Sequence, residues 1–581
     1  MATKPLTRPS KLILAAFENY SKDFLEITRR ARTRFEQQDW QGRHTDALER
    51  LDLYEKSLDA IARQLGDELG DTARDPEHWK KLKRVFTRLI EHRSDRDRAE
   101  TYYNSVTRKL LWTVGIDRNI EFFHREERPP TTQFELPVVR KYSYDTDTSR
   151  LIETILKDVQ FSVPYDNLDR DVHLIANEID LHVWPLTRYH SIDIAEVVVS
   201  PFFRNKVAYV VGRILASEHI IPLVLPVYNG PNGLYIDTVL LSEADVSRVF
   251  SFAFSYFQVE MPFPDQVIDF LRTILPHKPL AELYISLGLS KQGKTVLYRD
   301  LHRYVHVSRE KFVIAPGKEG AVMIAFTLPD YEFVLKIIKD HPCFLRTQDV
   351  TPKRSTRQEV MKQYDFVCHR DRVGRMVDTQ EFENLKFKRK RFTSTLLTEF
   401  GAAAREAVSI EREYIVLRHL YIQRKVSPLP MYLLRESDPE AVRRVVIDFG
   451  YFLKDLASVG IFPYDLFNMW NYGVTRRGRV VLFDYDDVQP LEKAQFRKKP
   501  EPRDESEELE PEEERIAAGG DDFFLDEADR FSGIPRPLKG IFKAVHADLY
   551  TLEFWRDMKR RVRRGEQFDI TPYDRYRKFR Y

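Results

Sequence analysis

The sequence predicts an α+β protein of two domains, a mostly helical one over residues 1–310 and a strand-rich one over residues 311–581. Two observations carry this prediction. Over residues 11–111, apolar side chains recur three and four positions apart, as on the buried face of a helix. After residue 310, short apolar runs follow one another at regular spacing, which is typical of strands. The length of 581 residues leaves room for about two to four domains.

The composition excludes several functional classes. Lys and Arg total 92 against 90 Asp and Glu, so the chain has no overall field for nucleic acid or an anionic membrane. The two cysteines, Cys343 and Cys368, are too few for a disulfide framework or a four-thiolate zinc site. No apolar run approaches the roughly 20 residues of a membrane helix. We therefore expect a cytoplasmic protein with no membrane partner and no nucleic-acid partner.

In the first domain, residues 220–227 and 234–241 predict two strands, because the Asn-Gly dipeptides between them favour a tight turn. We expect these strands to form a small sheet element. Residues 172–178 and 207–215 mix helix and strand signals.

In the second domain, an amphipathic helix is expected over residues 440–458, with Gly460 placed to end it. Residues 498–514 are dense in Glu and poor in apolar side chains, which predicts a solvated acidic insertion. The expected strands are residues 311–314, 321–327, 333–338, 414–422 and 480–483.

The strand 333–338 carries one embedded lysine. Alternate residues share a face of a strand, so Lys336 lies with the apolar Val334 and Ile338, where an unpaired ammonium would be costly. We therefore expect an anionic group to meet it. Upstream, the glycines of segment 315–321 would let backbone N–H groups approach a phosphate. A glycine-containing turn followed by a strand lysine is the order at the start of a kinase nucleotide site.

Later motifs continue this order. The helix 440–458 leads into a loop with Asp465 and Asn471, and the strand 480–483 is followed by Asp484 and Asp486. Kinase-like folds place a catalytic Asp and a metal-binding Asn on such a loop, and a second metal-binding Asp after the next hairpin. Oxygen ligands of this kind suit Mg²⁺. The alternative, that these acids only cap turns and strand ends, stays open from the residues alone.

A second kinase-like motif stands at the wrong place in the chain for its usual role. His369-Arg370-Asp371 spells the HRD of protein kinases, but Met376 stands where that motif requires Asn, and the triplet precedes the expected hinge strand. From its residues alone, the polar run 370–384 predicts a salt-bridged helix end.

Six segments together resemble the bacterial isocitrate dehydrogenase kinase/phosphatase family, and the resemblance covers essentially the whole chain. They are residues 315–317, 336–340, 371–384, 418–422, 473–476 and 483–486. The resemblance implies a helical regulatory domain and a bilobal protein-kinase-like domain, with an N-lobe over about 311–422 and a C-lobe over about 423–581. It further implies phosphorylation of a serine of NADP-dependent isocitrate dehydrogenase, and removal of that phosphate, which sets the flux between the tricarboxylic acid cycle and the glyoxylate bypass.

The resemblance also implies roles for individual residues. Asp465 would be the base that orients the serine hydroxyl, and Asp371 the acid associated with the phosphatase activity. Asn471 and Asp484 would hold Mg²⁺, with Asp486 assisting in the site. AMP is implied as an allosteric ligand. ATP would be bound by Ala315, Pro316, Gly317, Lys318, Glu319, Gly320, Ala321 and Lys336.

Alternative functions remain at this point. Six positions separate Asp465 from Asn471, whereas the family has five, and we expect residues 467–470 to absorb the extra one. The alternative is therefore a nucleotide-binding, kinase-like module with impaired kinase activity that mainly binds or dephosphorylates the dehydrogenase. The basic and aromatic tail after Lys559 would suit nucleic acid, but the balanced total charge disfavours that function.

Overall fold

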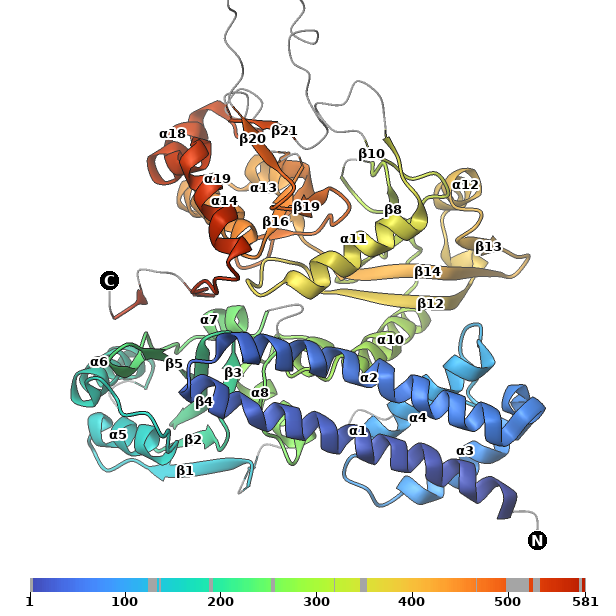
Figure 1. The fold of residues 1–581 in the computed structure, drawn as a ribbon, viewed down its shortest axis with the longest axis horizontal. Coiled ribbons are helices and arrows are strands. Elements are labelled where there is room, and N and C mark those ends of the chain that lie inside the picture. The colour runs from blue at the N-terminus through green and yellow to red at the C-terminus, as the bar shows by residue number, and fades with distance from the viewer. Residues whose placement is uncertain are drawn as a thin grey trace, which may run out of the picture. The chain divides into compact units, whose positions relative to one another are not determined.

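A computed structural model describes residues 4–123, 133–134, 137–187, 192–251, 256–317, 319–344, 353–464, 466, 468–497, 522–525, 533–573 and 577–579. The chain divides into two compact units (Figure 1): unit 1 is Met1–Ser308 with Thr571–Tyr581, and unit 2 is Arg309–Ile570. Lys318, Asp465 and the predicted acidic insertion 498–514 lie outside the described residues.

Both units combine helices with sheets, so the predicted α+β class is confirmed. Within the described segments we find no helix with the length and apolar character that a bilayer crossing requires.

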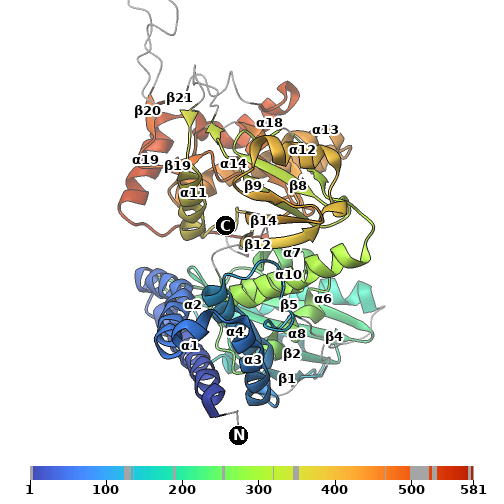
Figure 2. The ribbon, with the colours of Figure 1, turned by 90° about the vertical axis from the view of Figure 1, so that its right-hand side faces the viewer.

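Unit 1 begins with two long helices, α1 (Lys4–Glu36) and α2 (Trp40–Leu69), which lie side by side (Figures 1 and 2). Asp39 caps α2, because its carboxylate accepts a hydrogen bond from Gly42 N at 2.8 Å. The predicted three-and-four spacing places Leu58 and Leu65 on the buried face of α2. The other helices of unit 1 are η1 (Gly70–Arg74), α3 (Pro76–Ile90), α4 (Arg96–Leu111), α5 (Thr148–Asp158), α6 (Leu168–Thr187), α7 (Glu243–Val249), α8 (Pro264–Ile274), α9 (Leu280–Ser286) and α10 (Ser290–Val307).

The sheet of unit 1 is larger than the small element expected from the sequence. It has six strands in the order β1-β2-β4-β5-β6, with β3 paired to β4. They are β1 (Val139–Ser143), β2 (Ile194–Val198), β3 (Phe202–Arg204), β4 (Val207–Ala216), β5 (His219–Gly230) and β6 (Gly233–Ile236). The hairpin predicted from the glycine-containing turn is present as β5 and β6, which pair antiparallel.

The sequence conceals β4 because this strand is covered on both faces. Tyr209 and Val211 pack into one hydrophobic cluster, whereas Val210 and Ile214 pack into another. A strand buried on both faces is a continuous apolar run without alternation, and periodicity does not separate such a run from a buried helix. This is why residues 207–215 gave mixed signals.

Residues after position 570 return to unit 1. The Tyr573 hydroxyl donates to Asp237 Oδ2 at 2.6 Å, although the two residues are 336 positions apart. Lys578 Nζ lies 3.3 Å from the same oxygen, and Phe579 N donates to Asp237 O at 2.8 Å. The Asp237 side chain, which is buried after β6, is therefore paired by the end of the chain.

Unit 2 contains a second six-stranded sheet, in the order β12-β14-β9-β8-β7 with β13 paired to β14, and all of its pairs are antiparallel (Figure 2). The strands are β7 (Val313–Ile314), β8 (Met323–Thr327), β9 (Phe333–Ile338), β12 (Thr379–Lys388), β13 (Val408–Ile410) and β14 (Tyr414–Arg424). The strands predicted within residues 311–338 and 414–422 are confirmed.

The interpretation of residues 370–384 as a helix end is wrong beyond Asp371. Helix α11 (Arg357–Arg370) ends there, and the chain then forms β12. Phe382 and Leu385 of β12 are both buried, so the inward face changes from even to odd positions. The change occurs at Asn384, whose φ is +53°. This break in the alternation removes the period of two by which a strand is recognised in a sequence.

The rest of unit 2 is built around the predicted amphipathic helix, which is α14 (Pro439–Ser458). Gly460, at φ +74°, follows its end as expected. The other helices are η2 (Arg389–Arg391), α12 (Ser394–Ala403), α13 (Leu429–Arg435), η3 (Met469–Asn471), α18 (Arg536–His546), η4 (Ala547–Tyr550) and α19 (Leu552–Arg563). The short strands are β10 (Cys343–Phe344), β11 (Lys353–Arg354), β15 (Ser427–Pro428), β16 (Ile461–Pro463), β17 (Tyr472–Val474), β18 (Val480–Leu482), β19 (Val488–Pro490), β20 (Gln495–Arg497) and β21 (Asp522–Phe524).

The contact of α14 with α18 gives a stability prediction. A Cβ atom at Gly450 would lie 2.1 Å from His546 Cδ2, and the fully buried His546 ring is held by its Nε2 bond to Ile447 O at 2.8 Å. Gly450→Ala should therefore lower the free energy of unfolding by about 1–3 kcal/mol. Gly540→Ala in α18 is the matched control, because no atom lies within 4 Å of its Cβ, and it should stabilise by up to about 1 kcal/mol. Urea unfolding of both variants checks this, and equal stabilities would contradict it.

Candidate active site

Unit 2 contains a pocket of about 850 Å³ between the β7–β9 strands and the β17–β18 hairpin. It brings together most of the residues singled out from the sequence, although they come from four separate places in the chain. Those lining it are Ala315, Pro316, Gly317, Glu319, Gly320, Ala321, Lys336, Asn471, Asp484 and Asp486.

The glycine-containing segment connects β7 to β8 and covers one side of the pocket. Gly317 has φ +140°, a conformation that other residues rarely adopt. A Cβ atom at Gly320 would lie 2.6 Å from Met323 O, so a larger residue would not fit the backbone here. Gly317 thus allows the unusual backbone conformation of this connection, and Gly320 allows its close approach to Met323 O.

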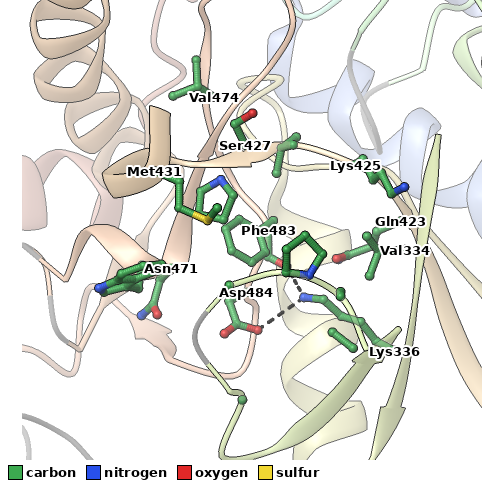
Figure 3. A pocket seen from close by; sticks show the side chains of 18 of the residues that line it. Val334, Lys336, Gln423, Lys425, Ser427, Met431, Asn471, Val474, Phe483 and Asp484 are labelled. Atoms are coloured by element: carbon green, nitrogen blue, oxygen red, sulfur yellow. Dashed lines mark hydrogen bonds and ion pairs between the residues drawn. The ribbon is translucent and has the colours of Figure 1, made fainter. Parts of the chain in front are cut away.

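Lys336 lies on β9, in the middle of the sheet, and its side chain is only 7% exposed. Its ammonium donates to Phe483 O at 2.7 Å and lies 3.4 Å from Asp484 Oδ1 (Figure 3). Asp484 is therefore the anionic group that the sequence led us to expect beside this lysine. Because a buried ammonium is costly without a partner, the two contacts fix Lys336 in the pocket.

Asn471 and Asp484 stand at the open end of one hairpin. Strands β17 and β18 pair with Tyr472 opposite Leu482, so Asn471 precedes the first pair and Asp484 follows the same pair after one further residue. Asn471 Nδ2 donates to Asp487 Oδ2 at 2.8 Å, which fixes the orientation of the amide. Figure 3 shows Asn471, Asp484 and Lys336 around the same space.

Asp486 is the most strongly perturbed acid of the site. Burial, together with the negative charge of Asp484 beside it, raises the pKa of Asp486 well above its usual range. The nearby Lys336 ammonium acts in the opposite direction but does not offset these effects. Asp486 Oδ1 is buried and, among the described residues, has no hydrogen-bond partner. Two carboxylates held this close are stabilised by a cation between or beside them.

The donor set fits Mg²⁺ bound together with phosphates. Among the described residues, no group of three or more His, Cys, Asp or Glu side chains is placed to hold a metal ion by itself. Mg²⁺, however, is commonly held by one or two carboxylates and by the phosphates of its nucleotide. Asp484, with the unpartnered Asp486 Oδ1 and the amide of Asn471 nearby, supplies oxygen donors of this kind.

Asp371 lies away from the pocket lining. It follows the last residue of α11, is 2% exposed, and its Oδ1 accepts hydrogen bonds from Val373 N at 3.0 Å and Gly374 N at 3.1 Å. Its carboxylate thus closes the turn between α11 and the segment leading to β12.

Two polar residues that the sequence argument did not single out, Asn468 before η3 and Asp487 after β18, also line the pocket. Asn468 lines the pocket, and its side chain caps η3 by accepting a hydrogen bond from Trp470 N at 3.3 Å. Asp487 also lines the pocket. Its position directly after Asp486 in the run Asp484-Tyr485-Asp486-Asp487 was the available signal. Gln423 lines the pocket from β14, and its Nε2 donates to Thr379 Oγ1 at 2.7 Å.

A buried strand lysine paired with an acid, a glycine-containing connection and oxygen donors suited to Mg²⁺ define the class of phosphoryl-transfer enzymes. Comparisons with known proteins agree. The family model for the isocitrate dehydrogenase kinase/phosphatase (AceK) regulatory domain matches residues 10–309, and the model for its kinase domain matches residues 310–575. The chain belongs to the isocitrate dehydrogenase kinase/phosphatase family.

Individual relatives span the whole chain. One from Anaeromyxobacter sp. (strain Fw109-5) is 41% identical over 561 residues, which cover 97% of this chain and 96% of the relative. One from Anaeromyxobacter dehalogenans (strain 2CP-C) is 38% identical over 98% of this chain and 97% of its own length. One from Yersinia enterocolitica is 33% identical over 100% of this chain and 99% of its own length. All three are named isocitrate dehydrogenase kinase/phosphatase, so the predicted family of kinase and phosphatase enzymes is confirmed.

The state of Asp486 gives a pH prediction. Its pKa is higher in the folded than in the unfolded chain, where an Asp titrates near about 4, so the folded state retains a proton that the unfolded state loses. The ligand-free protein should therefore lose stability as the pH rises above about 4, until the folded pKa is reached. Asp486→Asn should remove this part of the decline, measured as the urea midpoint against pH.

Asp484→Asn provides the companion measurement. It removes the negative charge that raises the pKa of Asp486, so it should reduce the slope without abolishing it. A parent protein and an Asp486→Asn variant with the same pH dependence would show that Asp486 is ionised in both states.

Proposed function

We propose that unit 2 is a bilobal, protein-kinase-like catalytic domain that transfers the γ-phosphoryl group of ATP to a serine of NADP-dependent isocitrate dehydrogenase. The same site would also support removal of that phosphate, so that the protein sets the flux between the tricarboxylic acid cycle and the glyoxylate bypass. The observation that carries the proposal is the Lys336–Asp484 ion pair inside a pocket bounded by a glycine-containing segment.

The arrangement of elements around the pocket supports two lobes. One side is the sheet that contains β9 and β14, which would be the core of an N-lobe over about residues 311–422. The other side is the β17–β18 hairpin, which packs near α14 and would belong to a C-lobe that begins at about residue 423. In kinase-like enzymes the nucleotide lies between such lobes, with its phosphates toward the strand lysine.

Each residue would then contribute one action. The glycine-containing segment would bind the phosphates through backbone N–H groups, and Lys336 would hold a phosphate oxygen in addition to its contact with Asp484. Asp465 would orient the serine hydroxyl and accept its proton as the new P–O bond forms and the bond to the β-phosphate breaks, so that ADP leaves. Asn471 and Asp484 would hold Mg²⁺, with Asp486 assisting; the metal, when bound, would neutralise phosphate charge.

Asp371 would serve the phosphatase direction, as the family resemblance implies. Its hydrogen bonds to Val373 N and Gly374 N leave it at the start of the segment that pairs with β18, the strand leading to Asp484. A part in dephosphorylation would therefore act through this segment or require a substrate that reaches it. AMP would be an allosteric ligand that favours this direction.

The alternative is a kinase-like module that binds nucleotide but has impaired kinase activity, and mainly binds or dephosphorylates the dehydrogenase. The observation that favours it is the extra residue between Asp465 and Asn471. Within this stretch the described residues Asn468, Trp470 and Asn471 form or cap the single turn η3. A displacement of the catalytic groups by about 1 Å is enough to cost roughly a hundredfold in rate.

Activity in both directions tests the proposal. Purified protein, γ-labelled ATP, Mg²⁺ and NADP-dependent isocitrate dehydrogenase should yield phosphoserine on the dehydrogenase. Lys336→Met should reduce this rate about a hundredfold or more, because it removes the cation that faces the phosphates. Lys386→Met is the matched control: Lys386 lies on β12 of the same sheet, its ammonium is 4.4 Å from the centroid of the Tyr414 ring, and it is not part of the pocket lining, so its rate should match the parent.

Two further variants separate the proposed roles. Asp465→Ala should reduce phosphorylation about 10²- to 10⁴-fold, as loss of a general base does. Asp371→Ala should reduce release of phosphate from the phosphorylated dehydrogenase more than it reduces phosphorylation. Full kinase activity of Asp465→Ala would remove Asp465 as the base, and a parent that binds ATP without forming phosphoserine would favour the alternative function.

A further inference from the structure

Arg375 forms an extensive buried ionic contact with two acids of α14. Its side chain is 6% exposed, and its guanidinium donates two hydrogen bonds of 2.8 Å to Asp448, one to each carboxylate oxygen. Its Nε donates to Asp455 Oδ2 at 2.8 Å, and its Nη1 also donates to Val480 O at 3.1 Å. Burial alone would raise the pKa of Asp448, but the Arg375 charge outweighs it and holds that pKa below its usual range.

These contacts join three separate parts of unit 2. Asp448 and Asp455 lie one above the other on α14, and Val480 begins β18. Asp448 Oδ2 also accepts a hydrogen bond from Val480 N at 2.7 Å, so both polar backbone groups of Val480 are held by this cluster. The main chain of Arg375 reaches the same strand, because Leu482 N donates to Arg375 O at 2.7 Å.

Stability alone does not account for such a cluster. Buried ion pairs are often replaced by apolar side chains without loss of stability, since desolvation offsets much of their attraction. What a planar guanidinium adds is direction, because its fixed fork defines where two carboxylate oxygens and a carbonyl must lie. The cluster therefore fixes how far β18 is shifted along its own direction relative to α14. Apolar packing, which has no directional bonds, fixes this position less precisely.

The position of β18 determines the position of the proposed metal ligands. Asp484 follows β18 after one residue, and Asn471 directly precedes β17, the strand paired to β18. We propose that Arg375 is a positioning residue that holds the β17–β18 hairpin so that Asn471 and Asp484 meet the same Mg²⁺. This inference rests on the proposed function, and it extends to a residue that touches neither the nucleotide nor the metal.

The two acids that Arg375 contacts provide a matched pair of variants. Asn at 448 keeps one acceptor oxygen, but its NH2 group replaces the other and places a donor against a donor of Arg375, so the two-bond contact that holds β18 is broken. Asn at 455 can keep the single bond from Arg375 Nε through its remaining oxygen, and within the described segments Asp455 forms no hydrogen bond with β18. Arg375→Lys, which retains the charge but lacks the fork, is the third variant.

Two quantities are measured on the full-length protein: the Mg²⁺ concentration that gives half-maximal phosphorylation of the dehydrogenase, and the Mg²⁺ concentration that gives half of the rise in unfolding temperature in the presence of ADP. The expected effects below apply to both. Asp448→Asn and Arg375→Lys should raise each concentration about 10- to 100-fold, the usual effect of losing a group that orients metal ligands. Asp455→Asn should leave each near the parent value, and the KM for the dehydrogenase should be unchanged in all three. Arg213→Lys, which alters a buried Arg–Glu pair of unit 1, controls for general destabilisation.

Thermal unfolding accompanies each assay, so that a variant that does not fold is recognised and the other two decide the outcome. Equal Mg²⁺ requirements in the parent, Asp448→Asn and Arg375→Lys would overturn the inference while leaving the proposed function intact. Equal increases in Asp448→Asn and Asp455→Asn would also overturn it, since they would reflect loss of buried charge and not of the hold on β18. A parent with no Mg²⁺-dependent phosphorylation would instead overturn the proposed function.

Discussion

The pocket of unit 2 depends on the need to pair one buried ammonium. Lys336 stands in the middle of a sheet, where its ammonium donates to Phe483 O and lies beside the Asp484 carboxylate. An unpaired charge at this depth would destabilise the fold by several kcal/mol. Separation of the sheet from the hairpin that carries Asp484 is therefore unfavourable. The interaction that fixes Lys336 in the pocket therefore also holds the two sides of the pocket together, and a ligand that binds this lysine would have to share it with Asp484.

The two acids Asp484 and Asp486 are not fully compensated by the single lysine beside them. Burial raises the pKa of Asp486, the negative charge of Asp484 raises it further, and the single nearby lysine does not offset both effects. By contrast, the cluster of Arg375 with Asp448 and Asp455, behind the same hairpin, is well paired. Unit 2 thus combines a rigid, satisfied ionic cluster with an unsatisfied acidic one, as expected where a cation completes the structure of a site.

The sequence predicted the parts of this site whose signal is local. An embedded lysine in an apolar strand, a helix ended by Gly460 and a hairpin followed by Asp484 each show within a few residues. Strand β12 was missed because Asn384 interrupts its alternation, and the sheet of unit 1 was underestimated because β4 is covered on both faces. The Arg375 cluster was also beyond the sequence, since it joins residues 73 and 80 positions apart through tertiary packing.

The pairing of Asp237 has a consequence for the order in which the protein is built. Its partners Tyr573 and Lys578 are synthesised after the whole of unit 2. When the ribosome has synthesised residues 1–308, the Asp237 carboxylate therefore still lacks these two partners. Unit 2 is, in topological terms, an insertion into unit 1. Unit 1 is therefore completed only after the whole of unit 2 has been synthesised.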